Sequence, residues 1–486
     1  MKALSGIVRN VVLLAIALAV SAQIPALAAD SSPNAALQLE DAFTSVAEKA
    51  FPAVVVIVNK RVAKRPMYPN LPPEFREWFG IPNRPGPGGE GEQAKPSPTP
   101  VGSGSGIIVR ADGYVLTNYH VVQESDALEV RLSDGRTFDS EEHEGSVEIV
   151  GYDEQTDLAV LKIGNGKIKD LPILPFADSD KVKPGQWAIA VGAPYNLDHS
   201  VTVGVVSYRG RHDMRMTSYE NYIQTDASIN PGNSGGPLLN IRGEVMGVNE
   251  FIVTGGGMSR GSVGIGFAIA SNLAKQVSDN LVEFGEVRRP FLGIGMQELS
   301  EDLKRQFGVE RGVVVSEVME GDPADKAGIK PWDVVLKVGN KEVGSPHDML
   351  FALLHQYKPG DEVKLVIDRQ GKRKEFTVVA RLRDDGGDRI PRQEKSRKDD
   401  TLNDLGLILE ETDKGIVVTG ISPGSPASRQ DLRRGDLILE VNRQRMKKIR
   451  DMDQALAGTK NDMAVLYVER RGSKFFVPIR TGDGGK

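Results

Sequence analysis

The sequence predicts a mainly β protein, in which an all-β barrel or sandwich precedes two copies of a smaller module. Between Ser105 and Ile269, short apolar runs alternate with turn residues, a spacing typical of β-barrels and β-sandwiches. Residues 312–343 and 415–446 then match at an offset of 103 residues without a gap, so one unit occurs twice. The length of 486 residues is sufficient for about three domains of ~150 residues each.

The first 28 residues have the pattern of a secretory signal peptide. Lys2 and Arg9 supply positive charge, residues 11–20 are apolar, and small residues at positions 26 and 28 precede the expected cleavage site. This apolar core is too short to cross a bilayer comfortably, because a spanning helix needs ~20 residues. We therefore expect export to a Gram-negative periplasm, with no stable membrane insertion after cleavage. An uncleaved membrane anchor is the alternative.

The composition excludes several classes of function. The chain has no cysteine, which rules out disulfides, thiolate zinc sites and cysteine nucleophiles. Its 61 basic and 66 acidic residues give a net charge of −5, so we expect no nucleic-acid partner. No Walker-type phosphate loop is present, and we expect neither a cofactor nor a metal ion.

Residues 38–59, after the signal peptide, predict a short helix that leads into a strand at 53–58. Residues 66–100 follow as a loop rich in proline and glycine. Three aromatic residues lie within positions 73–79 of this loop, which favours a loop that docks on another surface. A solvated linker remains the alternative.

Turn and cap signals divide the central β region. Asp112-Gly113 between apolar runs predicts a hairpin. The β pattern ends near Ile269, and a helix is expected from Ser271 to Glu283, with Ser271 as its N-cap.

The repeated module ends in a hairpin signal in both copies, at Gln370-Gly371 and at Arg471-Gly472. Between the copies, residues 383–400 carry 12 charged side chains in 18 positions. Such a segment buries too little apolar area to fold alone, so it is expected to be a linker.

Three segments of the β region carry residues suited to nucleophilic catalysis. Ser234 lies in Gly-Asn-Ser-Gly-Gly, His120 directly follows an apolar strand, and Asp157 precedes another one. A serine hydroxyl needs a base within hydrogen-bond reach, histidine is the natural base near neutral pH, and a carboxylate fixes its tautomer. The chain order His, Asp, Ser is that of the chymotrypsin-type proteases.

These segments, with the signal peptide and the two repeats, resemble the Do-like (HtrA/Deg) family of periplasmic serine endoproteases. The resemblance implies a chymotrypsin-like double β-barrel, followed by two PDZ domains of α+β type. It makes Ser234 the nucleophile, His120 the base and Asp157 the acid. The implied boundaries are 1–28 for the signal peptide, 29–288 for the protease domain, 289–382 for the first PDZ domain, 383–400 for the linker and 401–486 for the second PDZ domain.

The resemblance also implies a substrate site around the nucleophile. The N–H groups of Gly232 and Ser234 would form the oxyanion hole, with Asn233 between them. The S1 pocket and substrate strand would consist of Gly264, Ile265, Gly266, Phe267 and Ala268. The position six residues before the nucleophile is Ser228 rather than Asp, so a basic P1 residue would lack a counter-charge. The apolar lining of the predicted pocket favours small or medium aliphatic P1 residues. A plain core strand is the alternative for this segment.

Asn233 replaces the aspartate that zymogens use to bind a freed N-terminal amine, so that activation route is not expected. The resemblance implies that loops switch the site instead. The candidates are residues 207–220, with Arg211 as the regulatory residue, and residues 252–262 with their glycine triplet. Both segments can also be plain loop tips.

The first repeat resembles a peptide-binding PDZ domain. Its expected carboxylate-binding loop and strand consist of Phe291, Leu292, Gly293 and Ile294. A helix beside this groove should begin at Ser345, with Pro346 at its first position. The second copy has a weaker flank, and Trp332 stands where it has Gly435. Either repeat can instead be only an assembly module.

The resemblance implies an ATP-independent endoprotease that degrades misfolded envelope proteins, with chaperone activity in the same protein. Its partners would be unfolded clients and C-terminal peptides, and its assembly a homotrimer or a multiple of trimers. One alternative is a holdase or peptide-binding scaffold in which proteolysis is minor. Another is a membrane-tethered signalling protease, if residues 1–28 are not cleaved.

Overall fold

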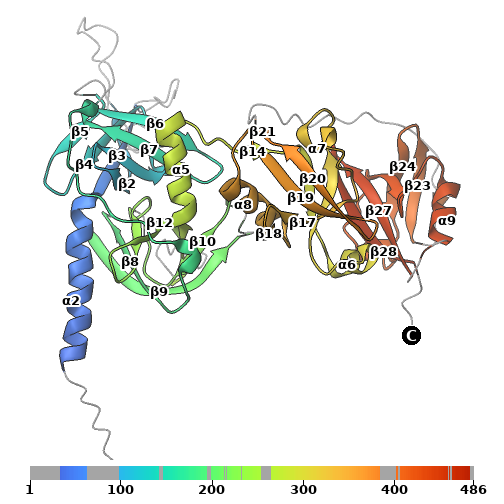
Figure 1. Cartoon of the computed structure of the whole chain (residues 1–486), viewed down its shortest axis with the longest axis horizontal. Coiled ribbons are helices and arrows are strands. Elements are labelled where there is room, and N and C mark those ends of the chain that lie inside the picture. The colour runs from blue at the N-terminus through green and yellow to red at the C-terminus, as the bar shows by residue number, and fades with distance from the viewer. Residues whose placement is uncertain are drawn as a thin grey trace, which may run out of the picture. The chain divides into compact units, whose positions relative to one another are not determined.

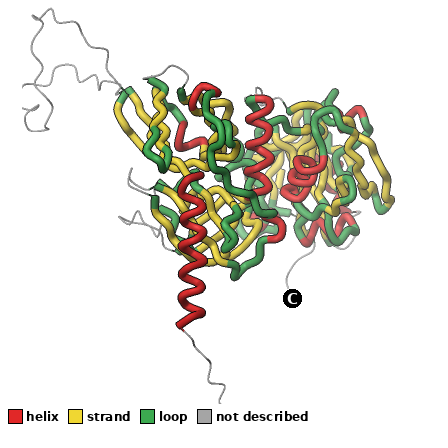
Figure 2. Tube along the Cα trace, turned by 60° about the vertical axis from the view of Figure 1, so that its left-hand side comes forward, coloured by secondary structure: helices red, strands yellow, loops and turns green. Residues whose placement is uncertain are grey.

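The computed structural model describes residues 33–62, 98–141, 146–193, 199–212, 214, 216–230, 232–252, 264–383, 401–402, 405–457, 459 and 462–481. The predicted signal peptide, the aromatic segment 73–79, nearly all of the loop 252–262 and nearly all of the linker lie outside these residues. The chain divides into two compact units, Met1–Val287 and Arg288–Lys486. Strands contribute more residues than helices to both units, which confirms the mainly β class (Figure 2).

The N-terminal unit begins with helix α2 (Pro33–Ala50), which leads through one short turn into β1 (Val54–Arg61) (Figure 1). The predicted order of helix and strand is confirmed, but the helix has 18 residues and is longer than expected. A seven-stranded sheet forms around β1 in the order β5-β4-β1-β2-β3-β7-β6. Its other strands are β2 (Thr99–Arg110), β3 (Tyr114–Asn118), β4 (Ala127–Arg131), β5 (Thr137–Asp139), β6 (Val147–Asp153) and β7 (Leu158–Ile163). The predicted hairpin joins β2 to β3, and Gly113 adopts a φ of 99° in its turn.

The second sheet of this unit is a closed barrel in the order β10-β13-β12-β11-β8-β9, in which β9 also pairs with β10. Its strands are β8 (Trp187–Gly192), β9 (Ser200–Arg211), β10 (Tyr222–Thr225), β11 (Pro237–Leu239), β12 (Val245–Ile252) and β13 (Gly266–Ala270). Small and branched apolar side chains such as Ala190, Ile223 and Ala268 fill its interior. Closure leaves this barrel without an unpaired edge.

Helix α5 (Ser271–Phe284) follows β13, but its cap differs from the prediction. Ala270 is the N-cap, and Ser271 is already the first helical residue. The Ser271 hydroxyl donates to the Ala177 carbonyl oxygen at 2.7 Å, while Ser179 Oγ accepts from the Asn272 N–H at 3.1 Å. The cap therefore comes from a segment about 90 residues away, which local sequence patterns do not reveal.

The first repeat is a sheet in the order β15-β16-β17-β19-β20, with β18 beside β17 and a separate pair of β14 and β21. The strands are β14 (Pro290–Phe291), β15 (Ile294–Glu298), β16 (Val313–Val318), β17 (Val334–Val338), β18 (Lys341–Glu342), β19 (Glu362–Arg369), β20 (Lys372–Val379) and β21 (Arg381–Leu382). The helices are α6 (Glu301–Phe307), α7 (Pro323–Lys326) and α8 (Pro346–Gln356). The predicted start of α8 is confirmed, because Ser345 and Asp348 form a reciprocal capping box.

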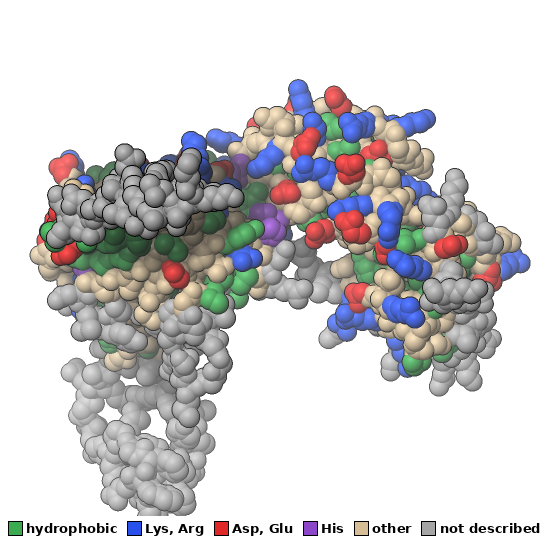
Figure 3. Space-filling view, turned by 90° about the horizontal axis from the view of Figure 1, so that it is seen from below, with side chains coloured by type: hydrophobic (Ala, Val, Ile, Leu, Met, Phe, Trp, Pro, Cys, Tyr) green, Lys and Arg blue, Asp and Glu red, His purple; other side chains and the backbone are tan. Residues whose placement is uncertain are grey.

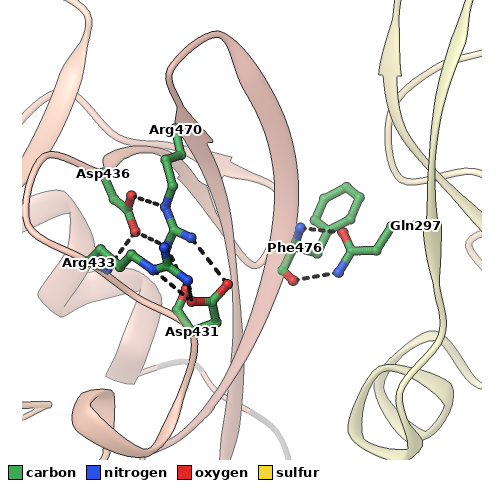
Figure 4. Close-up of polar contacts among 6 residues, drawn as sticks. All are labelled: Gln297, Asp431, Arg433, Asp436, Arg470 and Phe476. Atoms are coloured by element: carbon green, nitrogen blue, oxygen red, sulfur yellow. Dashed lines mark hydrogen bonds and ion pairs between the residues drawn. The ribbon is translucent and has the colours of Figure 1, made fainter. Parts of the chain in front are cut away.

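The second repeat has the same plan in the order β22-β23-β24-β25-β27-β28, with β26 beside β25. Its elements are β22 (Thr401–Leu402), β23 (Leu407–Thr412), β24 (Gly415–Ile421), β25 (Leu437–Val441), β26 (Gln444–Arg445), α9 (Ile449–Ala457), β27 (Met463–Arg470) and β28 (Ser473–Arg480). Both copies bury an aspartate under a bidentate arginine, which is Arg369 for Asp333 in the first copy. In the second copy Arg470 bonds Asp436 in the same way (Figure 4). The matched aspartates of the repeat are thus structural.

The two repeats pack on each other within the C-terminal unit. The Trp332 ring lies 4.4 Å from the Phe476 ring, and its indole N–H donates to Glu440 Oε2 at 2.7 Å. The Gln297 side-chain amide bonds both the N–H and the carbonyl oxygen of Phe476, at 2.7 and 2.8 Å (Figure 4). Acidic and basic side chains are interspersed over the face of this unit seen in Figure 3.

Candidate active site

His120 is presented by a single helical turn at the end of a strand. Strand β3 ends at Asn118, and α4 (Tyr119–Val122) follows at once. Buried Val121 and Val122 anchor this turn, while the His120 side chain remains 45% exposed. The backbone of His120 is therefore held in place, while its imidazole ring is accessible to a substrate.

Asp157 is held from both sides in an unusual backbone conformation. Its φ of 53° lies in the left-handed region, which a residue with a Cβ adopts at a cost of about 1–2 kcal/mol. Its carbonyl oxygen accepts from the Tyr119 N–H and from Asn118 Nδ2, each at 3.0 Å. Strain of this kind persists where surrounding contacts over-determine it, and such residues cluster at functional sites.

The Asp157 carboxylate contacts His120 at two atoms, the ring Nδ1 and the backbone nitrogen. Oδ2 lies 2.6 Å from the imidazole Nδ1, and Oδ1 accepts from the His120 backbone N–H at 2.9 Å. The carboxylate side chain is only 14% exposed. This arrangement places the proton of the neutral ring on Nδ1 and leaves Nε2 as the basic nitrogen.

Ser234 lies in the loop between β10 and β11, and hydrogen bonds from both sheets of the unit hold this loop in place. Its carbonyl oxygen accepts from the Ser105 N–H of β2 at 2.8 Å. The next residue, Gly235, donates its N–H to the Asn249 carbonyl oxygen of β12 at 2.9 Å. The Ser234 hydroxyl donates to the Glu250 carbonyl oxygen at 3.0 Å, and within the described residues it has no bond to His120.

The glycine after the nucleophile allows a close approach of the two sheets. Gly235 has a φ of 83°, and a Cβ there would overlap with the Ser105 carbonyl oxygen and with Thr117 Oγ1. The same Cβ would lie 3.2 Å from the Asn118 backbone nitrogen, two residues before His120. The structure thus brings the Ser234 segment to the end of the strand that carries His120.

Ser105 is a positioning residue that the sequence analysis missed. Its buried hydroxyl donates to the Gly232 carbonyl oxygen at 2.6 Å and accepts from the Ala193 N–H at 2.9 Å. It therefore ties β2 to the loop that carries Ser234. Its partner Gly232 lies 127 positions away, and nothing in the local pattern of Ser105 marks this contact.

The segment predicted for the oxyanion hole is buried and sharply turned. Gly232 has a φ of 105°, and Asn233 is 1% exposed. Among the described residues, the N–H groups of Gly232 and Ser234 donate to no other group. Two free donors in one tight turn suit an anionic oxygen.

The predicted substrate strand divides into an exposed and a buried part. Gly264 and Ile265 are exposed, with a φ of 81° at Gly264. Gly266, Phe267 and Ala268 are buried in β13, which pairs with both β10 and β12. A Cβ on Gly266 would come within 2.9 Å of the Ile229 side chain, so this strand lies directly against the loop before Ser234.

Arg211, the predicted regulatory residue, lies at the end of β9. Its Nε donates to Gln224 Oε1 at 3.1 Å, and its guanidinium lies 4.1 Å above the Tyr208 ring. These contacts fasten it to β10 and to its own strand.

Glu250 is a second residue that the sequence analysis missed. Its side chain is 6% exposed, and Oε1 accepts from the Tyr222 hydroxyl at 3.2 Å. Burial, and after it the negative charge of Asp157, raise the pKa of Glu250 well above its usual value. Burial also raises the pKa of Tyr222.

In the first repeat, the four residues predicted for peptide binding lie in one loop and strand. The carbonyl oxygens of Leu292 and Gly293 accept from Ala324 and Met319, at 2.8 and 2.9 Å. The N–H groups of Leu292 and Gly293 donate to no group in the described part of the chain. Gly293 has a φ of 77°, and Ile294 starts β15, the edge strand that contacts α8.

Three family profiles match the chain. A trypsin-like peptidase domain matches residues 104–248, and PDZ domains match residues 290–379 and 394–466. These matches confirm the predicted trypsin-like domain and the two PDZ domains after it.

Two relatives match this chain over 91% and 94% of its length. A probable periplasmic serine endoprotease DegP-like of Chlamydia pneumoniae is 37% identical over 464 residues, which cover 91% of this chain and 90% of that protein. The periplasmic pH-dependent serine endoprotease DegQ of Escherichia coli (strain K12) is 36% identical, with 94% of each chain covered. Among solved structures, HtrA-type protease AlgW with decapeptide is 32% identical, with a TM-score of 0.56, and covers 70% of this chain and 99% of its own.

Proposed function

The chain belongs to the family of DegP-like periplasmic serine endoproteases, and we propose that it cleaves peptide bonds through Ser234, His120 and Asp157. The observation that carries this proposal is the pair of contacts between Asp157 and His120, from Oδ2 to the ring Nδ1 at 2.6 Å and from Oδ1 to the backbone nitrogen at 2.9 Å. These contacts leave Nε2 of the exposed imidazole as the free base, beside the segment that carries Ser234.

The first half of the reaction transfers an acyl group to the enzyme. The Ser234 hydroxyl turns from the Glu250 carbonyl oxygen towards His120 Nε2, which takes its proton as Oγ attacks the peptide carbonyl carbon. The carbonyl oxygen becomes an anion that accepts from the N–H groups of Gly232 and Ser234. The His120 imidazolium, stabilised by Asp157, then gives its proton to the leaving amine as the C–N bond breaks.

The second half returns the enzyme to its starting state. Water gives a proton to His120 Nε2 and attacks the ester carbonyl carbon, and the same two N–H groups hold the second oxyanion. Collapse of this intermediate breaks the ester bond, and the proton returns to Ser234 Oγ. The products are an amine and a carboxylic acid.

The clients are misfolded or damaged envelope proteins, cleaved without ATP after small or medium aliphatic residues. Periplasmic location is supported by the names of the relatives and by the pattern of residues 1–28. Among the residues that the structure describes, no helix has both the length and the apolar character needed to cross a membrane. Assembly as a homotrimer or a multiple of trimers belongs to this proposal.

The first PDZ domain binds C-terminal peptides. The free N–H groups of Leu292 and Gly293 suit a terminal carboxylate, and the open edge of β15 can add a peptide strand beside α8. A structural neighbour is described as a protease with a bound decapeptide, which supports this role.

Cleavage of an unfolded protein such as casein tests the proposal. Ser234→Ala should abolish cleavage, while Ser473→Ala, at an exposed serine of the second PDZ domain, should cleave at the wild-type rate. Cleavage by Ser234→Ala at the wild-type rate would refute the assignment.

A holdase function is the second candidate, favoured by the resting position of the Ser234 hydroxyl on Glu250 rather than on His120. An enzyme in this state can bind a client without cleaving it. Ser234→Ala should then still suppress aggregation of a heat-unfolded client, measured by light scattering. No suppression at equimolar protein would remove this candidate.

A further inference from the structure

Glu250 combines two contacts that no part of the proposed reaction explains together. Its backbone carbonyl oxygen holds the Ser234 hydroxyl, while its side chain points into the buried interior beside β10. One carboxyl oxygen accepts from Tyr222, and the other has no hydrogen-bond partner among the described residues. A buried carboxyl oxygen without a partner is rare in folded proteins.

The groups around this carboxyl are acidic. Within the described part of the chain, the titratable groups that act on Glu250 are Asp157 from the β6–β7 turn, Tyr222 from β10, and Glu220 from the loop before β10. Each of them is neutral or negative near pH 7, and none is a cation. An ionised Glu250 would thus be a buried charge with like charges nearby, which is costly unless it is neutralised.

A chain of polar contacts extends from Glu250 to the loop between β9 and β10. The Tyr222 hydroxyl lies 3.2 Å from both Glu250 Oε1 and Thr217 Oγ1. The Glu220 carboxylate accepts from the N–H groups of Met214 and Met216, each at 2.6 Å. Strand β12, whose Glu250 carbonyl oxygen accepts from the Ser234 hydroxyl, is therefore joined to this loop through side chains.

We propose that Glu250 is a positioning residue that carries a proton in the folded enzyme at neutral pH, and that its uncharged carboxyl keeps β12 and the Ser234 hydroxyl in place. The neutral acid accepts from Tyr222 and puts no second negative charge beside Asp157. The burial and the acidic neighbours that raise the pKa of Glu250 support this state. The link to catalysis rests on the proposed function of Ser234, whereas the protonation does not.

The proposal fixes the sign of a pH effect on stability. In the unfolded chain Glu250 ionises near its ordinary pKa of about 4.3, whereas the folded enzyme keeps the proton to a higher pH. The folded state then binds more protons than the unfolded state, so this residue destabilises the fold as pH rises between the two pKa values. A glutamine, which cannot ionise, removes this dependence.

Thermal unfolding of the full chain tests the protonation. All variants carry Ser234→Ala to prevent self-cleavage, and Tm is measured from pH 4.5 to pH 8. The Tm of Glu250→Gln should rise relative to the parent as pH increases, while Glu148→Gln, at an exposed glutamate of β6, should follow the parent. A constant Tm difference between Glu250→Gln and its parent across this range would overturn the proposal.

Kinetics of the active enzyme test the positioning. Glu250→Gln, which mimics the neutral acid, should retain kcat, whereas Glu250→Ala should lower kcat more than it changes KM. An equal loss of kcat in both variants would show that the charged carboxylate is required and would overturn the proposal. The unfolding experiment needs no protease activity, so failure of the proposed function is distinguishable from failure of this inference.

Discussion

The candidate active site depends on single residues whose backbone few amino acids can adopt. Asp157 takes a left-handed conformation that places its carbonyl oxygen on Asn118 and Tyr119, and its carboxylate on His120. Gly235 takes the same region of φ, but for another reason, because only hydrogen fits between Ser105 and Thr117. Strain at one position fixes the orientation of His120, and close approach at the other brings the Ser234 segment to the end of β3.

Replacement of the Asp157 carboxylate by an amide should disable the base while leaving the fold intact. Asp157→Asn can donate to Nδ1, which favours the wrong imidazole tautomer, so kcat should fall by about 10⁴-fold. Steady-state cleavage of a peptide substrate measures this. Asp112→Asn, at an exposed aspartate bonded to Arg110, should leave kcat unchanged. A loss in Asp157→Asn confined to KM would contradict the assigned role.

Alanine substitutions at two glycines distinguish the cost of a left-handed backbone from the cost of a steric overlap. Gly235 and Gly243 have φ values of 83° and 78°, but a Cβ on Gly243 meets nothing within 4 Å. Gly243→Ala should cost about 1–2 kcal/mol of unfolding free energy and stay active. Gly235→Ala should be less stable and should lose activity, because the added methyl group displaces Ser234. Urea unfolding and peptide cleavage measure both, and equal behaviour of the two variants would refute the steric argument.

Short motifs in the sequence mark the residues proposed for catalysis, whereas residues defined by contacts between distant segments carry no such mark. His120, Asp157 and Ser234 each lie in a recognisable segment. The structure bonds Asp157 to His120 and brings Gly235, the residue after Ser234, close to Asn118 at the end of β3. Ser105 and Glu250 could not be found this way. The bond of Ser105 to Gly232 spans 127 positions, and the burial of Glu250 follows from barrel closure, which no local pattern encodes.

At the scale of elements, local signals predicted what local contacts determine. The start of α8 was predicted correctly because Ser345 and Asp348 cap each other within four residues. The cap of α5 was predicted wrongly because Ser179, from another segment, supplies it. The repeat itself was evident, but one difference between its copies was not. Strand β22 pairs with β23 on the edge that corresponds to the open edge of β15.

This difference predicts that only the first PDZ domain binds peptides readily, since β22 already occupies the groove edge of the second. Gly293 and Gly406 are equivalent left-handed glycines, and a Cβ would overlap with Asp322 at one and with Ser425 at the other. In full-length Ser234→Ala protein, calorimetric titration with a peptide that has an apolar C-terminus should show binding that C-terminal amidation abolishes.

The matched variants assign the site of binding. Gly293→Ala should lose most of the affinity for this peptide, and Gly406→Ala should keep it. Loss of binding in Gly406→Ala alone would place the peptide in the second domain and contradict the role of β22.

At the scale of the whole C-terminal unit, the two repeats form one body through Trp332. The second repeat has Gly435 at this position, with a φ of 93°, while Trp332 accepts a φ of 73°. The first repeat thus tolerates backbone strain at a position where its copy has none. The indole of Trp332, which the second repeat lacks, contacts Phe476 and donates to Glu440 across the interface.

Trp332→Gly should therefore uncouple the two PDZ domains. Loss of a buried tryptophan costs about 3–5 kcal/mol, and relief of the left-handed backbone returns about 1–2 kcal/mol. Differential scanning calorimetry should resolve an additional unfolding transition in this variant. Lys474→Ala, which removes a partly exposed ion pair to Glu317 at the same interface, should cost no more than about 1 kcal/mol. An unchanged transition in Trp332→Gly would show that the interface adds no coupling.

The central claim, that His120 and Asp157 activate Ser234, is tested most directly by fluorophosphonate labelling in the presence of an unfolded client, with the adduct located by mass spectrometry. The account predicts a single adduct on Ser234, no adduct in Ser234→Ala, and strongly slowed labelling in His120→Ala. An adduct on another residue, or labelling of His120→Ala at the wild-type rate, would contradict it.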